Sequence, residues 1–256
     1  MKLTKSLFVS AVLFLSATGA QAAGFVQNGN YLTVQLKQHQ NYGPSQIRLQ
    51  VVSDRIIRVQ ATAEQSFRNK QSLIIVPQKG KANYKVEEQG DDLIITTAAM
   101  RAVLNEATGQ ITFYDLKDQV LLKEVAQGGK TFKPFTVPDR EIGVDIAKVP
   151  EAQKHGWSWR ALFDSPDNEA FYGLGQHQSE ELNMKGKNED LFQYNTKVSV
   201  PFVISNKNYG ILWDSYSYSR WGNPDDYLQL NHAFKLYDKD GKEGQLTGTY
   251  VAKNGQ

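Results

Sequence analysis

The chain has 256 residues, with 29 Lys and Arg against 27 Asp and Glu, and it contains no cysteine. A formal net charge of +2 gives no electrostatic footprint for nucleic acid or an anionic membrane, so neither is an expected partner. The lack of cysteine excludes a disulfide framework, a thiolate nucleophile or metal ligand, and a lipidated N-terminal Cys.

The N-terminus has the pattern of a secretory signal peptide. Basic residues precede the apolar run 7–15, and a small-residue site follows at 20–22. The run is shorter than the roughly 20 residues that cross a bilayer. We expect a signal peptide over residues 1–22, cleavage before Ala23 and a periplasmic or secreted chain; an uncleaved anchor or a buried helix is the alternative. Loss of its lysines leaves a nearly neutral chain, which suits a neutral partner such as a glycan.

Alternating apolar residues predict strands in the first part of the chain. The period-two pattern covers residues 31–37 and 46–51, with another strand around 57–59. The positions expected to face inward are Leu32, Val34, Leu36, Ile47, Leu49 and Val51. Residues 84–86 and 93–96 flank a turn signal and predict a β-hairpin.

Two interpretations compete over residues 97–107. Their composition favours a helix, with Gly109 placed as a C-cap. The neighbouring segments favour a strand ending at Leu104, a turn through Gly109 and return strands over residues 111–114 and 120–122. Because few segments keep a helical period, we expect the strands and an all-β fold, an antiparallel β-sandwich.

Prolines interrupt the segment between residues 128 and 167, and its ordered part is expected at residues 156–160. A strand there would place Trp157 and Trp159 on one face. We expect both indoles to cover a sheet face as core, because large aromatic side chains are usually buried. A platform for stacking sugars is the alternative.

Residues 171–213 are the stretch around which the chain is organised. Short apolar runs alternate with Gly, Asn and Lys, so the backbone is expected to turn back repeatedly and gather Tyr, Trp, Gln, Asn and Lys side chains. Such a mixture suits sugar recognition. The motifs in it are Phe171-Tyr172-Gly173-Leu174-Gly175-Gln176, Gln193-Tyr194-Asn195, and Pro201-Phe202 leading to Tyr209-Gly210-Ile211-Leu212.

These motifs resemble the N-terminal β-sandwich of glycoside hydrolase family 31, and above all its secreted bacterial α-xylosidases. The resemblance implies a galactose-mutarotase-like supersandwich within a retaining α-glycosidase that removes α-linked xylose or glucose from plant oligo- or polysaccharides such as xyloglucan. In the family, both catalytic Asp residues belong to a (β/α)8 barrel, so no residue here inherits a catalytic role. The resemblance implies no cofactor. The expected role is to brace the missing catalytic barrel of the same polypeptide and to line the substrate pocket.

The family's N-terminal domain reaches the sugar through a loop whose counterpart here is residues 193–197. Tyr194 and Asn195 match its aromatic-Asn pair, whereas Lys197 or its neighbour stands where many relatives carry Asp. The resemblance implies that Tyr194 lines the pocket and that Asn195 fixes the loop, and it makes Lys197 a candidate sugar ligand. Trp213, in an aromatic-rich span, is a further expected sugar contact. The alternatives are a loop that is only ordered by these residues and aromatic rings that cover the barrel.

Other polar motifs favour structural roles. Adjacent acids, such as residues 91–92 and 180–181, point to opposite faces of a strand and make poor catalytic pairs. The Gly173-Leu174-Gly175 motif lacks the third glycine of a dinucleotide site and is expected to allow close packing of strands. The histidines show no metal-ligand spacing, and His177 is expected to be a hydrogen-bonded structural residue. The sequence at 238–241 lacks the Glu of a calcium loop.

Residues 246–251 predict a strand, and the Asn-Gly pair at 254–255 is a hairpin signal with no strand after it. We therefore expect a signal peptide over residues 1–22, the β-sandwich over 23–250, and the start of a truncated following region over 251–256. Two other functions remain open. A free-standing carbohydrate-binding module would bind sugar without catalysis. A sugar epimerase would need a His and a carboxylate around the anomeric centre, and the spacing provides no such pair.

Overall fold

The computed structural model describes residues 24–37, 40–68, 71–76, 82–136, 146–148, 150–151, 155–178, 181–222 and four later strands. Across these residues the fold is all-β with antiparallel strand pairing, as predicted. The described residues include one short 3-10 helical turn, η1 (Ile146–Lys148). The signal-peptide segment, the 238–241 motif and the 254–255 turn lie outside the described residues.

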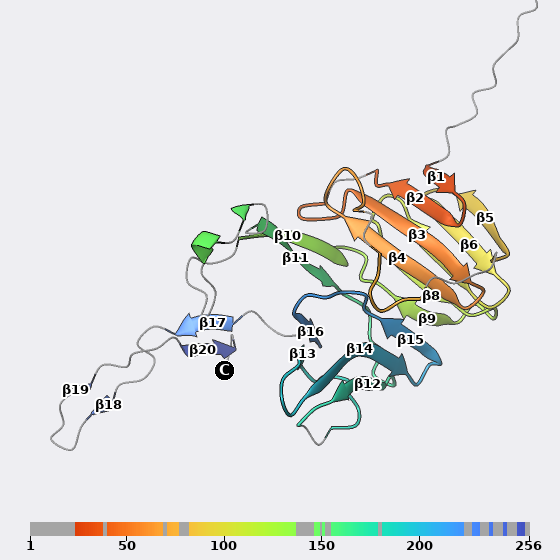
Figure 1. The fold of residues 1–256 in the computed structure, drawn as a ribbon. Coiled ribbons are helices and arrows are strands. Elements are labelled where there is room, and N and C mark those ends of the chain that lie inside the picture. The colour runs from red at the N-terminus through yellow and green to blue at the C-terminus, as the bar shows by residue number, and fades with distance from the viewer. Residues whose placement is uncertain are drawn as a thin grey trace, which may run out of the picture. The chain divides into compact units, whose positions relative to one another are not determined.

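The chain divides into two compact units. Unit 1 comprises residues 1–67, 80–111 and 126–161, and unit 2 comprises residues 68–79, 112–125 and 162–256. The strands of both units are shown in Figure 1.

The first sheet has the order β1-β2-β3-β4 and is formed by β1 (Phe25–Asn28), β2 (Tyr31–Gln35), β3 (Gln46–Ser53) and β4 (Ile56–Thr62). Residues on alternate positions of β2 and β3 are buried, which confirms the period-two prediction. The fully buried members of this face are Leu32, Val34, Ile47, Leu49 and Val51.

A second sheet has the order β5-β6-β7-β8-β9. Its strands are β5 (Tyr84–Gln89), β6 (Asp92–Thr97), β7 (Arg101–Asn105), β8 (Ile111–Tyr114) and β9 (Val120–Lys123). The predicted hairpin is present, and its two-residue turn includes Gly90 at a φ of +65°.

Residues 97–107 form a turn and a strand, so the strand interpretation is confirmed. Thr97 donates its hydroxyl to the Asp54 carbonyl at 2.7 Å, and the same oxygen accepts the Met100 amide at 3.0 Å. These bonds fix a turn that is incompatible with a continuous helix through this segment. Ala102 and Leu104 are then fully buried on alternate positions of β7. Tertiary burial has overridden local propensity here.

The core of unit 1 lies between the inner faces of the first sheet and of strands β5, β6 and β7 of the second, which is the arrangement of a β-sandwich. The turn at Gly109 closes one side of it, because a Cβ built there would lie 3.0 Å from Leu36 and 3.1 Å from Ile47. A separate ribbon in unit 1 pairs β10 (Lys130–Thr136) with β11 (His155–Ala161).

Unit 2 contains a three-stranded sheet of order β12-β14-β15, formed by β12 (Phe171–Gln176), β14 (Val198–Ser205) and β15 (Tyr209–Leu212). Two-stranded pairs accompany it: β13 (Glu189–Leu191) with β16 (Ser219–Trp221), β17 (Tyr227–Leu230) with β20 (Tyr250–Lys253), and β18 (Leu236–Tyr237) with β19 (Glu243–Gly244). The strand predicted at 246–251 is described only from Tyr250 onward. Its partner β17 was not anticipated.

The core of unit 2 gathers around the inner face of this sheet. Its buried residues are Phe171, Leu174, Met184 and Val203, with the partly buried Leu191, Tyr209, Ile211 and Trp221 packed against them. Trp221 also donates its indole N–H to the Met184 carbonyl at 3.1 Å, so its polar edge is satisfied.

The Gly173-Leu174-Gly175 motif lets β12 approach β14 closely, as predicted from the sequence. A Cβ on Gly173 would lie 2.6 Å from the Phe202 carbonyl oxygen, and one on Gly175 would lie 2.0 Å from the Val198 carbonyl oxygen. Both glycines have positive φ, +127° and +98°, and the strand register shifts between them. Only glycine fits these two positions without displacing the neighbouring backbone.

Candidate functional site

The predicted sugar loop is a tight turn between β13 and β14. Tyr194 and Lys197 form an isolated antiparallel bridge, and the Lys197 amide donates to the Tyr194 carbonyl at 3.0 Å. This pairing places Asn195 at the exposed tip of the turn. The Tyr194 ring is 49% exposed and lies 6.1 Å from the Phe192 ring, centroid to centroid. The turn therefore presents two neighbouring aromatic rings and an amide to its surroundings.

Lys197 is directed inward, in contrast to Tyr194 and Asn195. Its side chain is only 7% exposed, and its ammonium is hydrogen-bonded to Oε1 of Glu189, at the start of β13. The same carboxyl oxygen lies 3.0 Å from Nδ1 of His177. The imidazole Nε2 donates a hydrogen bond to the Leu174 carbonyl at 2.7 Å, so His177 is hydrogen-bonded, as predicted.

Trp213 lies directly after β15 and is half-buried. Its backbone N–H donates to the Pro201 carbonyl at 2.8 Å, so the chain beyond the β14–β15 hairpin is tied back to β14. The nearby tyrosines are more exposed, Tyr216 at 55% and Tyr218 at 60%. The Tyr218 hydroxyl donates to Asp190 at 2.7 Å. Of the aromatic residues in this span, Trp221 belongs to the core of unit 2, and the two tyrosines face solvent.

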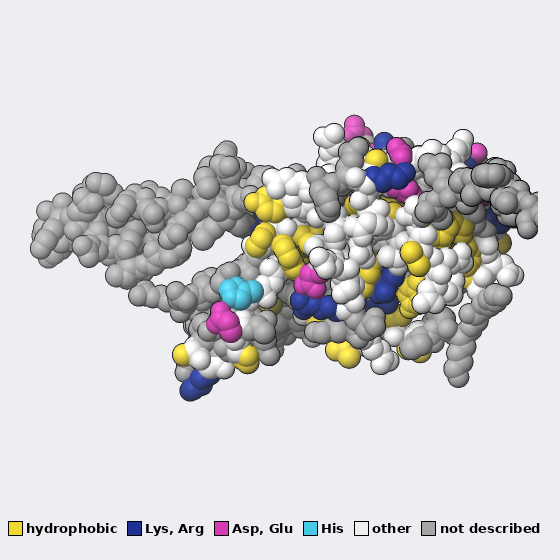
Figure 2. Space-filling model, turned by 90° about the horizontal axis from the view of Figure 1, so that it is seen from above, with side chains coloured by type: hydrophobic (Ala, Val, Ile, Leu, Met, Phe, Trp, Pro, Cys, Tyr) yellow, Lys and Arg dark blue, Asp and Glu magenta, His cyan; other side chains and the backbone are white. Residues whose placement is uncertain are grey.

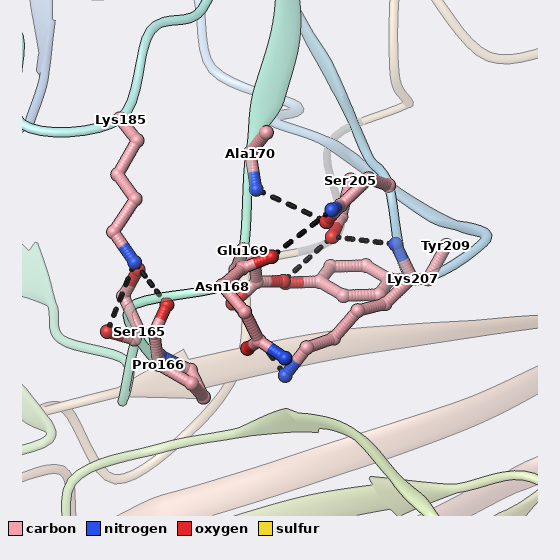
Figure 3. A network of polar contacts seen from close by, with 10 residues as sticks. Ser165, Pro166, Asn168, Glu169, Ala170, Lys185, Ser205, Lys207 and Tyr209 are labelled. Atoms are coloured by element: carbon pink, nitrogen blue, oxygen red, sulfur yellow. Dashed lines mark hydrogen bonds and ion pairs between the residues drawn. The ribbon is translucent and has the colours of Figure 1, made fainter.

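The β14–β15 hairpin is anchored by a buried carboxyl group that sequence inspection did not single out. Figure 3 shows the hydroxyls of Ser205 and Tyr209 both directed at Glu169. The two donors lie 2.6 and 2.7 Å from the Glu169 Oε1, and the Lys207 ammonium lies 4.0 Å from the other carboxyl oxygen. Burial, with the bond to Glu169, raises the pKa of Tyr209. The group holds the hairpin turn against the segment before β12.

The outward face of β14 is a continuous apolar row. Successive outward positions on this strand carry no polar side chain, and residues on both neighbouring strands extend the row. We call this set the β14 apolar row: Val198, Val200, Phe202 and Ile204, with Tyr172 on β12 and Leu212 on β15, each 38–50% exposed. Monomeric soluble proteins rarely leave a contiguous apolar patch uncovered without a binding role.

Trp157 and Trp159 lie on one face of β11, as predicted, but they are not core residues. They are 43% and 41% exposed, respectively, and both contact the buried Phe132 on β10. The Trp159 ring stacks on Phe132 at 6.1 Å, and the Trp157 ring meets it edge-on at 6.5 Å. The expectation of burial was wrong, because in the described part of the chain this ribbon pairs only two strands, β10 and β11, and leaves both indoles partly exposed.

The adjacent acids discussed above have structural partners where they are described, and Asp92 accepts the Asn105 side-chain amide at 2.9 Å. Asp91 accepts from Lys37 at 2.8 Å, and Glu181 accepts from Lys187 at 2.8 Å, which lowers the pKa of Glu181.

The described residues contain no group of three or more His, Cys, Asp or Glu arranged to hold a metal ion. They also include no helix that is long and apolar enough to cross a membrane.

Charged side chains of both signs lie interspersed on the face shown in Figure 2. Among the described residues on that face, Lys and Arg are not gathered into one large patch. The formal net charge of the whole chain is +2.

Comparisons with known proteins identify the family. Residues 46–221 match the glycosyl hydrolase 31 N-terminal galactose mutarotase-like domain. The chain is 26% identical over 178 residues to an uncharacterized family 31 glucosidase of Pseudescherichia vulneris, covering 66% of this chain and 32% of the relative. It is 25% identical over 185 residues to an alpha-xylosidase of Saccharolobus solfataricus, covering 68% of this chain and 23% of the relative.

Two solved structures agree with this assignment. A family 31 α-xylosidase of Xanthomonas citri superposes with a TM-score of 0.69 at 36% identity, over 85% of this chain and 22% of that one. A family 31 α-xylosidase from a soil metagenome, solved with xylose, gives a TM-score of 0.58 at 25% identity, over 77% of this chain and 28% of that one. The chain thus spans about a third or less of each relative. It belongs to the glycosyl hydrolase family 31 N-terminal galactose mutarotase-like domain family.

Proposed function

We propose that this chain is the N-terminal domain of an α-xylosidase-like hydrolase that acts on α-linked xylose in plant oligo- or polysaccharides. Its work is to brace a catalytic barrel of the same polypeptide and to line the substrate pocket. The observation that carries the proposal is the 36% identity to the Xanthomonas citri α-xylosidase over 85% of the chain, together with the short fraction of that enzyme it spans.

The bracing role is supported by the β14 apolar row. Six large apolar side chains on three adjacent strands remain 38–50% exposed, which leaves a surface suited to packing against another domain. An interface that stays closed permanently is more apolar than the rest of a protein surface, and this face has that composition. The barrel is the occupant that the family assignment supports.

The role in the pocket is supported by the turn at Tyr194. A half-exposed aromatic ring beside an exposed amide is a combination that stacks on a pyranose and hydrogen-bonds its hydroxyls. Trp213, half-buried where the chain leaves β15, is the second proposed sugar contact. Catalytic roles are assigned to no residue of this chain.

The test uses the polypeptide encoded by the complete reading frame that contains these 256 residues. We expect it to release xylose from 4-nitrophenyl α-D-xyloside and from xyloglucan oligosaccharides, and Tyr194→Ala to raise KM at least about tenfold, the range that one lost ring contact explains. Tyr42→Ala is the matched control, because Tyr42 is also 49% exposed but belongs to unit 1. If the polypeptide hydrolysed no α-xyloside, the proposed activity would be refuted.

A second candidate function, a free-standing carbohydrate-binding module, is favoured by the exposure of Trp157 and Trp159. Half-exposed indoles suit sugar stacking. Calorimetry of the chain itself with xyloglucan oligosaccharides separates the two functions. Binding that is lost in the Trp157→Ala/Trp159→Ala double variant would favour the module, and no binding would favour the larger hydrolase.

We also propose export to the periplasm or the medium, from the signal-like pattern of residues 1–22. Cell fractionation followed by N-terminal sequencing tests this. A mature chain that begins at Ala23 is the expected result, and a cytoplasmic chain that begins at Met1 would contradict it.

A further inference from the structure

Three ionisable side chains meet in the interior of unit 2, behind the Tyr194 turn. Their side chains are 5% exposed for His177, 14% for Glu189 and 7% for Lys197. They come from three different segments: the residue after β12, the first residue of β13 and the residue before β14. We call them the Glu189 cluster, because one carboxyl oxygen is common to both contacts.

The contacts of the cluster join these three segments at one point. Oε1 of Glu189 bonds the Lys197 ammonium and lies 3.0 Å from His177 Nδ1. The other imidazole nitrogen, Nε2, donates to the Leu174 carbonyl at 2.7 Å. Leu174 has a φ of +68°, a backbone conformation that is costly for a branched side chain. Such a conformation persists only where surrounding contacts hold it, and the hydrogen bond from His177 to the Leu174 carbonyl is one of these contacts.

Lys197 connects the Glu189 cluster to the turn, because its side chain bonds Glu189 and its backbone bonds Tyr194. A buried ammonium is retained only where it is paired and hydrogen-bonded, so Glu189 fixes the position of the Lys197 side chain. The backbone of the same residue closes the turn, through its amide bond to the Tyr194 carbonyl at 3.0 Å. The position of Tyr194 and Asn195 therefore depends on a carboxyl group that neither of them touches.

We propose that Glu189 and Lys197, packed beside His177, are positioning residues that set the sugar-facing turn. Lys197 acts through Glu189 and through its own backbone, without contact between its ammonium and the sugar. The turn then presents only uncharged groups, the Tyr194 ring and the Asn195 amide, which fits a neutral pyranose better than an acidic sugar. This inference deepens the proposed function and rests on it for the identity of the ligand.

The first test needs no hydrolase activity, because it follows the turn in the chain itself. The readout is amide hydrogen exchange of residue 197, whose N–H is the donor that closes the turn. Lys197→Met and Glu189→Gln are each expected to speed this exchange at least about tenfold, since each removes the charge pair that fixes the side chain. The amides of the β14–β15 hairpin, in the same unit but away from the turn, are expected to keep their protection, which shows that unit 2 is still folded.

Lys187→Met is the matched control. Lys187 also pairs with a glutamate in unit 2, Glu181 at 2.8 Å, but both side chains are exposed, at 48% and 39%. Exposed pairs contribute little, so this variant is expected to leave the exchange of residue 197 unchanged. Lys197→Arg keeps the charge and is expected to restore most of the protection. Unchanged exchange in both Lys197→Met and Glu189→Gln would overturn the proposal.

The second test uses the complete polypeptide and separates positioning from direct contact. Under the proposal, Lys197→Met and Glu189→Gln raise KM for the xyloside by similar factors, Lys197→Arg recovers it, and the double variant is no worse than either single one. A rise in KM for Lys197→Met with unchanged turn exchange and an unaffected Glu189→Gln would mean direct contact and would refute the proposal. A polypeptide without hydrolase activity would contradict the proposed function while the exchange result still decides on positioning.

Discussion

The hydroxyl of Tyr209 donates a 2.7 Å hydrogen bond to Oε1 of Glu169, a residue 40 positions earlier in the chain. The glutamate side chain is 1% exposed, and its carboxyl group also accepts the Ser205 hydroxyl at 2.6 Å. Because the phenol is partly desolvated and faces a carboxyl group, the pKa of Tyr209 is raised, and its neutral form is favoured in the folded chain. This contact ties the β14–β15 hairpin to the segment before β12, as Figure 3 shows.

The raised pKa of Tyr209 predicts a loss of stability in alkali. Below the ordinary value of 10.0 the phenol is neutral in the folded and unfolded chains, so the contribution is fully present. Above it the unfolded chain releases the proton first, and stability falls as pH rises toward the folded pKa, by at most about 1.4 kcal/mol per pH unit and less because the ring is partly hydrated. Urea unfolding at pH 8 to 11 measures this slope. Tyr209→Phe is expected to flatten it, and an equally steep slope would contradict the assignment.

Gly175→Ala is expected to destabilise unit 2 by more than about 2 kcal/mol, because the new Cβ would overlap a carbonyl oxygen and the residue would keep a positive φ. The Cβ would lie 2.0 Å from the Val198 oxygen, at a φ of +98°. Gly156→Ala is the control, since a Cβ there meets nothing within 4 Å. Thermal unfolding of both variants compares them. Similar melting temperatures would mean that the strands are not held this closely.

Leu49→Ala is expected to cost about 2–5 kcal/mol, the range for a cavity in a packed core. Leu49 is fully buried on β3, whereas Leu73 is 82% exposed. Leu73→Ala removes the same atoms from the surface and is expected to change stability by less than about 0.5 kcal/mol. Denaturant titration of the chain measures the difference between the two variants. Equal effects would contradict the assignment of the core to the inner faces of unit 1.

Ile204→Lys places a charge in the middle of the β14 apolar row. The side chain is 49% exposed, so the chain by itself is expected to lose less than about 1 kcal/mol, whereas in the complete polypeptide the charge is buried against the barrel and lowers the melting temperature. Val26→Lys, at a position 70% exposed on β1, adds the same charge outside the row. Thermal unfolding of the two variants of the complete polypeptide is the measurement. Equal melting temperatures would contradict the interpretation of the row as an interface with the barrel.

The strands were predictable wherever one face is buried and the other is not. Residues on alternate positions of β2, β3 and β6 follow the inside-outside period of a half-buried sheet, and this signal is local in the sequence. The segment at 97–107 was ambiguous because its composition favours helix, and the decision came from the Thr97 turn and the burial of Leu104.

The candidate site was less accessible to sequence reasoning. The turn at Tyr194 could be predicted from a motif. The inward direction of Lys197, however, depends on its bond to Glu189, eight residues earlier. Glu189 in turn lies beside His177, which is twelve residues before it in the chain. Pairings of this kind follow from the tertiary register of β12, β13 and β14, and no local pattern encodes them. The exposure of Trp157 and Trp159 has the same origin, because it depends on how many strands join the ribbon.

The register shift at the Gly173-Leu174-Gly175 motif limits how this sheet can change length during evolution. From Gly173 to Gly175 β12 advances by two residues, while its partners on β14 run from Val203 to Ser199. The mismatch is therefore an even number, so the inside-outside alternation of β14 continues through the shift, while Leu174, within the shift on β12, is turned into the core. The insertion or deletion of two residues there would preserve the faces of the sheet. The insertion or deletion of one residue would turn the core side chains of the strand outward and the side chains of the β14 apolar row inward.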